Sequence, residues 1–481
     1  MNYHEEIKKI VKEIKTQGYE NVCFMQPAYN IGGGPLIETK MAEYLANNTD
    51  LNIYFCDYKD GYGEYLLKNC SKVKILEFKD NEIYFPLREK CILLTNSTRV
   101  TLIKKMHLES KIVFWHYETI PCAWNNVLIE NETRKFLELV KKNKAMIYHD
   151  WSGRDSLSRI SDIKFTNKDY LHITLDKKNK QTNGILINKN EINICFLSRL
   201  ASDKIQSLYY LIDNVSSYKT DKKIKLHIIG DGLLKKQVLK FCSRYNNIEF
   251  IFTGTIAKEN LDDYLIGNAD IVFGVGTCVL ESSALKIPSA VLLMNNSKIY
   301  DTDAFWIFNS KEYCVGILTD EKTDFNIKYT NICKILDEIY KRNGKDLYGN
   351  KCYQYFIENH NQYDKLAANF LSYLNKTTLT FKKLEKCIKY IPYNCHKIKV
   401  YKFLGIFIGK KIEFIGKTRF LLFGHIKLIK KIVSNNKITY YFCGIKIAQC
   451  IEKKTYNFPT AKFNDKNTYM KNISMIDNKR V

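Results

Sequence analysis

The sequence predicts an α/β protein of two Rossmann-like, doubly wound domains facing a cleft, followed by a basic, aromatic, β-rich C-terminal tail. Short apolar runs alternate with helical patterns up to residue 375, and this series restarts after a polar stretch. Residues 376–481 then differ sharply in charge from the rest. With 481 residues, 45% of them apolar, the chain is long enough for at least two hydrophobic cores.

Five apolar runs in the first half are expected to be buried parallel strands, at 21–29, 51–56, 90–94, 111–115 and 145–148. The first run ends in the glycine-rich segment Ile31-Gly-Gly-Gly-Pro35, and a helical pattern follows it. The polar stretch 176–184 is expected to be a linker or surface loop, so the first domain is placed at residues 1–185.

A second α/β series is expected to form a domain over residues 186–375. Its strands are expected at 192–197, 224–229, 248–252, 269–273 and 289–293, and each gap between them can hold one helix. Doubly wound sheets bind ligands outside the carboxyl ends of their strands. The residues that follow each strand are therefore the candidate site.

Basic residues and glycines follow the first three of these strands. Arg199 and Lys204 come after the first strand, and two cations there suit a diphosphate, because Arg offers a fork of donors and Lys a point charge. Such a pair is also common as plain surface decoration. The second strand runs into Gly230-Asp-Gly232 and the third ends at Gly254, and glycine lets a backbone approach a ligand closely.

The fourth strand carries the most informative pattern. After Gly276, Thr277 is expected to cap a helix whose first backbone N–H groups, including that of Cys278, form an anion site. Glu281 falls about one turn into this helix. Its carboxylate could accept hydrogen bonds from sugar hydroxyls, such as a ribose diol, or it could interact only with the helix dipole.

In order and spacing, these motifs resemble the donor domain of group 1 (family 4-like) retaining glycosyltransferases, which have the GT-B fold and build bacterial surface polysaccharides. The matching segments are Arg199-x4-Lys204, Gly230-Asp-Gly232, Phe252-Thr-Gly254, Ala269-Asp270 and Gly276-Thr-x3-Glu281-x6-Pro288. The resemblance covers residues 190–295 and, more weakly, 20–50, where Gly33 and Gly34 stand in place of the family's glycine-rich loop.

The resemblance implies that a nucleotide-sugar donor binds to residues 186–375 and an acceptor to residues 1–185, with retention and without an essential metal or other cofactor. It implies catalytic roles for Arg199, Lys204 and His116. The implied donor-binding residues are Gly33, Gly34, Gly230, Gly232, Gly254, Gly276, Thr277, Cys278 and Glu281. One departure concerns a first glutamate that much of the family carries eight residues before the second, where this chain has Phe273.

Histidines and acids follow strands of the first half. His116 comes after the strand at 111–115 and is expected to point toward the cleft, although a single histidine there is often only structural. Glu118 and His149-Asp150 also follow strands and could contact acceptor hydroxyls. Nothing in the sequence selects among them.

The cysteines and the start of the chain indicate the compartment. Fifteen cysteines include no Cys-x-x-Cys pair, so we expect structural thiols in a reducing environment. The start lacks the basic and apolar regions of a signal peptide, and no apolar stretch is long enough to span a membrane. A cytoplasmic protein is expected.

The tail, residues 376–481, carries 24 Lys and Arg against 5 Asp and Glu, a net charge of +19 out of +24 for the chain. Its glycines Gly405, Gly424 and Gly444 each follow an aromatic residue by four positions, which makes a threefold repeat of about one hairpin each. A basic, aromatic surface suits an anionic membrane. The alternatives are nucleic acid, which we consider unlikely as a partner, and a β-rich appendage with no partner.

The sequence thus predicts a glycosyltransferase (EC 2.4) that transfers a sugar from a nucleotide-sugar to a glycan or lipid-linked acceptor. It would act at the inner face of the cytoplasmic membrane, in the synthesis of a cell-surface polysaccharide such as lipopolysaccharide or capsule. The alternative is a non-catalytic relative that binds a sugar nucleotide or glycan as a scaffold, and Phe273 in place of the first glutamate favours it.

Overall fold

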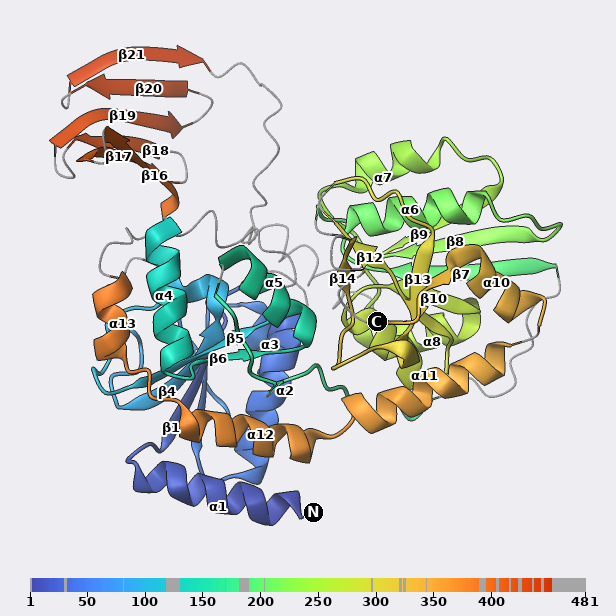
Figure 1. The fold of residues 1–481 in the computed structure, drawn as a ribbon, viewed down its shortest axis with the longest axis horizontal. Helices are drawn as coiled ribbons and strands as arrows, with labels where there is room; N and C mark the ends of the chain where they lie inside the picture. Colours follow the sequence, from blue (N-terminus) through green and yellow to red (C-terminus); the bar gives the residue numbers. More distant parts are fainter. Residues whose placement is uncertain are drawn as a thin grey trace.

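The computed structural model describes residues 2–29, 33–80, 82–117, 130–161, 163–168, 170–180, 190–202, 204–295, 297–319, 322, 326–342, 344–388, 395–403, 406–414, 417–422, 426–434, 437–442 and 445–451. These residues form two parallel α/β sheets with their helices, and a third, antiparallel sheet near the C-terminus (Figure 1). The predicted fold class is confirmed by the two parallel sheets.

The first sheet is built from the apolar runs of the first half. Its strands are β1 (Asn21–Met25), β2 (Asn52–Asp57), β3 (Lys74–Glu77), β4 (Cys91–Asn96), β5 (Lys111–His116) and β6 (Met146–Tyr148). They are all parallel and lie in the order β3-β2-β1-β4-β5-β6. The edge strand β3 was not predicted, because its side chains are mostly exposed and it lacks an apolar run.

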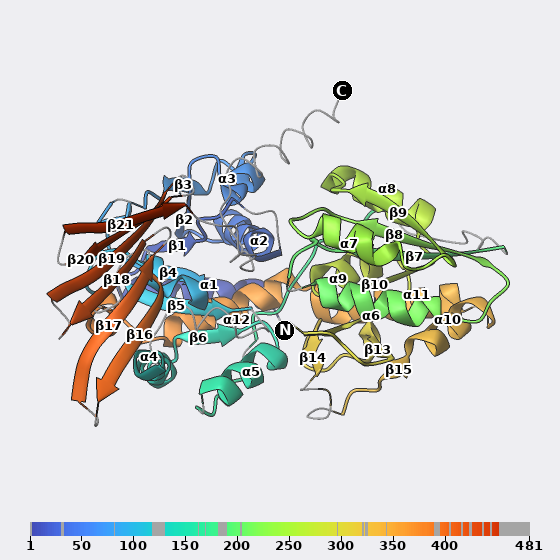
Figure 2. The same ribbon diagram turned by 90° about the horizontal axis from the view of Figure 1, so that it is seen from above.

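Helices connect these strands and pack on the sheet. They are α1 (Tyr3–Thr16), α2 (Gly33–Asn48), α3 (Tyr62–Leu67), the 3₁₀ helix η1 (Ser97–Leu102), α4 (Glu130–Lys142) and α5 (Trp151–Ser161). In α1 the buried side chains Ile7, Ile10, Val11 and Ile14 recur at three- and four-residue spacing, so they form one apolar face. Figure 2 shows α2 and α3 on the side of this domain that faces the second sheet.

The second sheet repeats the pattern with one reversal at its edge. Its strands are β7 (Glu191–Leu197), β8 (Lys223–Ile229), β9 (Ile248–Gly254), β10 (Ile271–Gly274), β11 (Ser289–Val291), β13 (Asp303–Trp306) and β15 (Thr330–Asn331). The order is β15-β13-β11-β10-β7-β8-β9, and β13 is antiparallel to both of its neighbours. A separate parallel pair joins β12 (Leu293–Met294) and β14 (Ile317–Leu318).

The helices of this part are α6 (Ile205–Ser216), α7 (Lys235–Cys242), α8 (Lys258–Asn268), α9 (Thr277–Ala284), the 3₁₀ helix η3 (Ile307–Asn309), α10 (Ile332–Tyr340) and α11 (Lys345–His360). The start of β10 is tied to the last two of these helices. Asp270 is buried there and accepts hydrogen bonds from Lys345 Nζ at 2.8 Å and Tyr340 Oη at 3.0 Å. The Ala269-Asp270 motif therefore anchors the strand.

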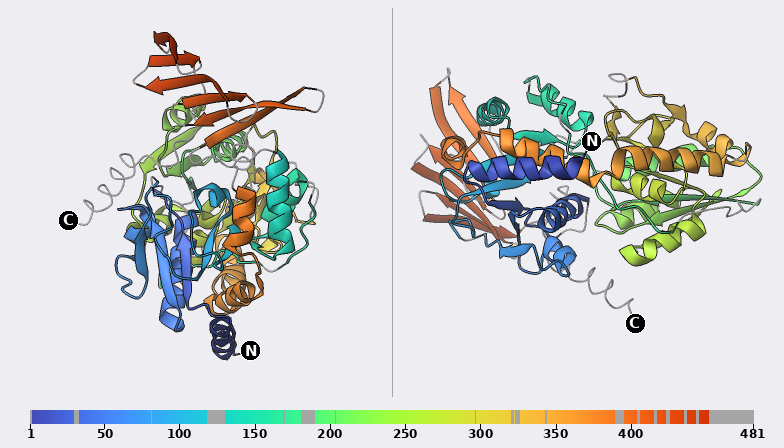
Figure 3. Two further views of the ribbon diagram at one scale, coloured as in Figure 1. Left: turned by 90° about the vertical axis from the view of Figure 1, so that its left-hand side faces the viewer. Right: turned by 90° about the horizontal axis from the view of Figure 1, so that it is seen from below.

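The chain then returns to the first sheet. Helices α12 (Tyr363–Lys376) and α13 (Phe381–Ile388) follow α11, and α12 packs against α1, as Figure 3 shows, while α13 packs against α4. The backbone between them lies beside β5, because Ile112 N donates to Leu379 O at 2.9 Å and Phe381 N donates to Ser110 O at 2.8 Å. Residues 363–388 are thus part of the packing around the first sheet.

The tail contains an antiparallel sheet in which each strand pairs with the next. Its strands are β16 (Cys395–Phe403), β17 (Ile406–Phe414), β18 (Lys417–Leu422), β19 (Ile426–Ser434), β20 (Lys437–Phe442) and β21 (Ile445–Ile451). The three repeat glycines at 405, 424 and 444 lie outside the described residues. Among the described helices, none is both long and apolar enough to cross a membrane.

Candidate functional site

The loops after β7 and β8 touch each other at the carboxyl end of the second sheet. Gly230 has a φ of +129°, and a Cβ atom added to it would lie 2.0 Å from the carbonyl oxygen of Ser198. A Cβ on Gly232 would lie 2.5 Å from Leu200 O, and Leu200 N donates to Asp231 O at 3.0 Å. These glycines therefore let the two loops pack together, and their contact with a ligand stays a prediction. The amide of Gly230 also donates to Gly254 O at 2.8 Å.

The two predicted phosphate-binding residues, Arg199 and Lys204, lie between the end of β7 and the start of α6. Arg199 is exposed, and Lys204 is half-buried at the start of α6, with its Nζ 3.6 Å from the sulfur of Met294. Burial raises the pKa of the Cys278 thiol to about 11, and the positive charge of Lys204 opposes that rise. Lys204 therefore lies within electrostatic reach of the start of α9.

Helix α9 begins at Thr277, directly after a glycine whose φ is positive. Gly276 has a φ of +86° and a ψ of −142°, which L side chains rarely adopt, and an added Cβ would meet no atom within 4 Å. Its amide donates to Val315 O at 2.8 Å. The first N–H groups of a helix have no acceptor in the helical ladder, so the start of α9 can face an anion.

Glu281 lies one turn into α9 and is only 8% exposed. Burial raises the pKa of its carboxyl group, and the positive charges of Lys178 and Lys258 oppose the rise. Its Oε2 atom is buried without a hydrogen-bond partner among the described residues. A buried acceptor in this state costs about 1–3 kcal/mol, so a ligand hydroxyl that donates to it would be held strongly.

Phe273 is the residue at which the resemblance would place a first glutamate. It lies within β10, is completely buried, and pairs with Phe196 of β7 and Ala290 of β11. This position therefore holds an apolar side chain of the sheet's core and presents no carboxylate to a ligand.

The first domain reaches the start of α9 through its glycine-rich segment. A Cβ atom on Gly33, the first residue of α2, would lie 3.3 Å from Thr277 Cγ2. A Cβ on Gly34 would lie 2.8 Å from the hydroxyl of Tyr117, which follows β5. The structure thus brings together two predicted site residues, Gly33 and Thr277, whereas Gly34 packs against Tyr117.

His116 is the last residue of β5 and is 4% exposed. Its Nδ1 lies 2.8 Å from Ser97 Oγ. Its pKa is lowered to about 3. Burial is the main cause and the charge of His149 adds to it, while the charge of Asp150 opposes both. His116 is therefore neutral at pH 7, and whether it contacts a donor stays a prediction.

The other acidic and histidine candidates after these strands have different positions. Glu118 lies outside the described residues. His149 and Asp150 are both buried, with His149 Nε2 2.9 Å from Asp150 Oδ2. Asp150 Oδ1 accepts from Gly153 N at 2.9 Å, so one role of this carboxylate is to hold the first turn of α5.

A polar network at the carboxyl end of the first sheet was not predicted from the sequence. Gln26 donates to Tyr117 Oη at 2.7 Å, and that hydroxyl donates to Glu38 Oε1 at 3.2 Å. The side chain of Arg99 donates to Gln26 Oε1 and, at 2.7 Å, to Pro27 O. Burial raises the pKa of Glu38 to about 8, while the charge of Arg99 opposes the rise. The four side chains come from separate segments, so no local motif marks them.

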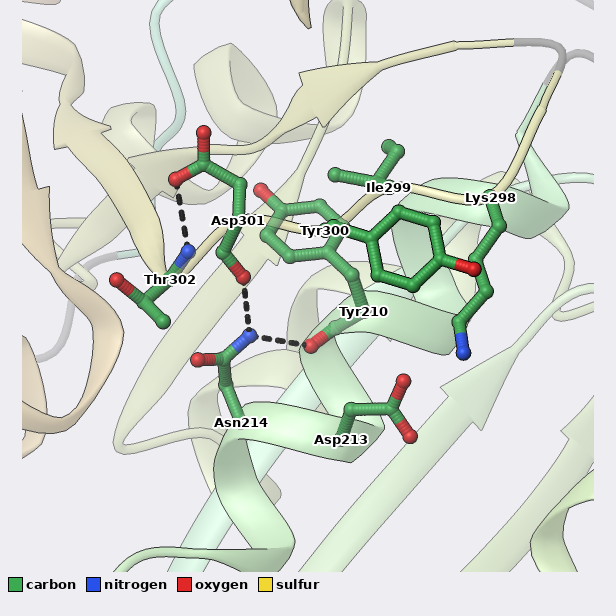
Figure 4. A pocket seen from close by; sticks show the side chains of 8 residues that line it. All are labelled: Tyr210, Asp213, Asn214, Lys298, Ile299, Tyr300, Asp301 and Thr302. Carbon is green, nitrogen blue, oxygen red and sulfur yellow. Dashed lines mark hydrogen bonds between the residues drawn. The ribbon is translucent and has the colours of Figure 1, made fainter.

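A cavity of about 280 Å³ lies elsewhere, beside α6 (Figure 4). It is lined by Tyr210, Asp213, Asn214, Lys298, Ile299, Tyr300, Asp301 and Thr302. None of these residues follows one of the strand ends at which the motifs gather. Because the cavity is open and away from α9, we place the candidate site at the start of α9 instead.

The sequence matches no protein-family profile and no curated protein. Among solved structures, the chain is similar to HepE of Anabaena in complex with UDP-glucose, with a TM-score of 0.50 and 13% identity over 73% of this chain and 99% of that one. A mutant of S. aureus TarM in complex with UDP gives 0.48 and 12% over 74% and 100%. A glycosyltransferase of Rickettsia africae gives 0.47 and 13% over 77% and 99%.

At identities this low, structural similarity shows the fold alone. We rely on the similarity to HepE, for which the TM-score is 0.50. The two parallel α/β sheets with their helices, and the return of the chain to the first sheet through α12, agree with that similarity. The chain has the GT-B fold of glycosyltransferases.

Proposed function

We propose that this protein is a glycosyltransferase that transfers a sugar from a nucleotide-sugar to a glycan or lipid-linked acceptor, with retention at the anomeric carbon. The observation that carries the proposal is the convergence at the start of α9. Lys204 lies within electrostatic reach of it, and Gly33 approaches Thr277 from the other domain. Glu281 presents a buried oxygen that has no hydrogen-bond partner among the residues that the structure describes.

The proposed roles follow from the charges. Arg199 and Lys204 would bind the diphosphate and neutralise the negative charge that grows on the leaving nucleotide, while the first N–H groups of α9 would add fixed dipoles. Cations placed in this way supply charge that a metal ion supplies in other transferases, so we propose that no metal is essential. Glu281 would accept hydrogen bonds from a donor diol. UDP-glucose is the first donor to test, because HepE was solved with it.

The experiment is nucleotide release from UDP-glucose, GDP-mannose, ADP-glucose and CMP-N-acetylneuraminate, with and without lipid-linked glycan. For the active donor, Arg199→Ala and Lys204→Ala are each expected to lower turnover about a hundredfold with an unchanged melting temperature, because each removes charge stabilisation of the leaving group. Lys240→Ala, at an exposed lysine of α7, is the matched control. Near-normal turnover in both site variants would contradict the phosphate assignment.

A second candidate function is a non-catalytic scaffold that binds a sugar nucleotide or glycan. The buried Phe273 favours it, because the family's first glutamate is replaced by a core side chain. Binding of a donor in the same panel without nucleotide release, with every acceptor tried, would support this candidate against the enzyme.

We also propose that the basic tail, residues 376–481, docks the protein on an anionic membrane, at the inner face of the cytoplasmic membrane where lipid-linked acceptors of surface polysaccharides such as lipopolysaccharide or capsule are found. The net charge of +19 over residues 376–481 supports this, because each Lys or Arg near an anionic surface contributes about 1 kcal/mol.

A further inference from the structure

The first sheet has its topological switch point between β1 and β4, which lie side by side at its centre. From β1 the chain runs to β2 and β3 on one side, and from β4 it runs to β5 and β6 on the other. Doubly wound sheets bind ligands outside the carboxyl ends of two such strands. This end of the sheet faces the second domain, because Gly33, in the segment after β1, approaches Thr277. The residues that follow β1 and β4 are therefore placed to meet a ligand.

An arginine joins the two strands at this switch point. Arg99 belongs to η1, which follows β4, and its side chain is half-buried. Its Nε donates a hydrogen bond to Gln26 Oε1, and its Nη1 donates to Pro27 O at 2.7 Å, so the guanidinium group reaches across to the residues after β1. Within the described ranges, Nη2 makes no hydrogen bond and no carboxylate lies within ion-pair distance of this side chain. The Nη2 donors are therefore available to a ligand.

The partner of this arginine is itself fixed in one orientation. Gln26 is 3% exposed, and both ends of its side-chain amide are engaged, since Oε1 accepts from Arg99 and Nε2 donates to Tyr117 Oη at 2.7 Å. The hydroxyl of Tyr117, which follows β5, donates in turn to Glu38 Oε1 at 3.2 Å. Because each member of this network positions the next, the guanidinium group is held in place before any ligand binds.

The acids around this network leave the positive charge of Arg99 without a counter-ion in contact with it. Glu38 is completely buried, and burial raises its pKa to about 8, so its carboxyl group is mostly neutral at pH 7. Asp57, at the end of β2, is ionised at pH 7, because burial raises its pKa only to about 6. Its oxygens, however, accept from backbone amides, including Ala28 N and Gly63 N, both at 2.8 Å. The surroundings of Arg99 therefore favour a bound anion.

We propose that Arg99 binds an anionic oxygen group of the acceptor, a phosphate or a carboxylate, at the switch point of the first sheet. This inference rests on the proposed function and names the chemical class of its acceptor, which is a charged glycan or glycan phosphate. A guanidinium group suits both anions, because its planar array of N–H donors matches their oxygens. The diphosphate of the donor is assigned to Arg199 and Lys204 in the second domain, so each anion has cations of its own.

The test is isothermal titration of the full-length protein at pH 7 with glucose 1-phosphate, glucuronate and the neutral methyl glucoside. Both anions are expected to bind at least about tenfold more tightly than methyl glucoside, because each accepts charge-assisted hydrogen bonds. Arg99→Gln should remove this difference, and Arg99→Lys should keep part of it, because lysine keeps the charge without the planar donors. Arg88→Gln, at an exposed arginine of the same domain, is the matched control and should bind as wild type does. Melting temperatures should stay within a few degrees of wild type.

A second variant shows which domain holds the anion. If Arg199→Ala abolishes binding of both anions while Arg99→Gln binds them as wild type does, the anion occupies the diphosphate site of the second domain. The inference is then overturned and the proposed function stands. Equal affinity of wild type for the charged and the neutral probes would overturn the inference as well.

Inorganic phosphate distinguishes the sources of the anion. If it binds through Arg99 as tightly as glucose 1-phosphate does, the site takes free phosphate, which overturns the assignment to an acceptor. Tighter binding of glucose 1-phosphate than of inorganic phosphate supports the assignment, because the sugar then contributes to recognition. If none of the four donors is bound or releases its nucleotide, the proposed function fails, and an anion held by Arg99 does not belong to an acceptor.

Discussion

Glu38 shows how a single buried side chain can make stability depend on pH. Its folded-state pKa is raised to about 8 by burial, so the carboxyl group is mostly protonated in the folded protein and ionised in the unfolded chain at pH 7. For a raised pKa, the stabilising contribution is complete below the unfolded value and is lost as the pH rises through the folded one. Glu38 therefore lowers stability progressively between about pH 4.5 and pH 8.

Replacing Glu38 with Gln tests this directly. Glu38→Gln keeps the shape of the neutral acid without the protonation cost, so we expect it to raise the free energy of unfolding by up to about 3 kcal/mol at pH 8 and to leave it unchanged at pH 4. Urea unfolding at both pH values measures the difference, with the exposed Glu20→Gln as the control. A variant less stable than wild type at pH 8 would show that Glu38 is ionised in the folded protein.

Glu281 separates a binding role from a stabilising one. If it holds a donor diol, Glu281→Gln should weaken nucleotide-sugar binding while the melting temperature stays within a few degrees of wild type. If it interacts only with the dipole of α9, its replacement should cost about 0.3–1 kcal/mol of stability and leave donor affinity unchanged. Titration and a melting curve on the same variant distinguish these results. We expect the first, because the described part of the chain offers no hydrogen-bond partner to the buried Oε2 of Glu281.

At the scale of elements, the loop after β8 depends on its glycine, Gly230, more than the loop after β10 depends on Gly276. Gly230→Ala would place a methyl group 2.0 Å from Ser198 O, whereas Gly276→Ala would place it in open space, although both positions have a positive φ. We expect backbone strain of about 1–3 kcal/mol at Gly276 and a clearly larger loss, above about 4 kcal/mol, at Gly230. Equal losses in urea unfolding would mean that the loops after β7 and β8 can separate without cost.

The sequence was sufficient to predict most strands of the two α/β sheets, because each is a short apolar run that is buried in the fold. It was insufficient for β3, whose exposed side chains make no such run, and for α12 and α13, whose packing on the first sheet depends on contacts far along the chain. In the candidate site, local motifs predicted the positions around α9. They could not predict Glu38, because it is buried in a network of side chains from separate segments of the chain.

At the scale of the whole molecule, buried histidines lie where the chain crosses between the domains. His172 stacks on Tyr313 with ring centroids 3.9 Å apart, and His360 Nδ1 lies 2.6 Å from Ile173 O. Burial lowers the pKa of His172 well below its ordinary value and that of His360 to about 4. With folded values below the unfolded value of about 6.5, their stabilising contribution is complete above pH 6.5 and is lost as the pH falls.

We therefore expect the free energy of unfolding to decrease as the pH falls from 7.5 to 5, with about 2 kcal/mol of the decrease coming from His360. His172→Phe keeps an aromatic ring against Tyr313 but cannot be protonated, so it should make the decrease smaller while preserving stability at pH 7.5. Chemical unfolding across this range is the measurement. An unchanged pH dependence in the variant would contradict the contribution assigned to His172.

The tail can be tested by truncation after Ile388, because residues 377–388 pack around the first sheet and must be kept. The shortened chain should stay soluble and active on a short, water-soluble acceptor, yet fail to sediment with anionic vesicles. The full chain should sediment at low salt and be released at high salt, since screening weakens the attraction. Equal sedimentation of both forms would exclude the tail as the anchor, and a preference for single-stranded nucleic acid at matched salt would favour that partner.

The central claim is that a nucleotide-sugar binds at the start of α9. Hydrogen–deuterium exchange of the full-length protein, with and without saturating UDP-glucose or the donor that binds best, tests it most directly. We expect the bound donor to slow exchange at residues 198–202 and 276–281. Protection confined to residues 298–302, beside the cavity of Figure 4, or no protection at α9 while the donor is bound, would contradict the account.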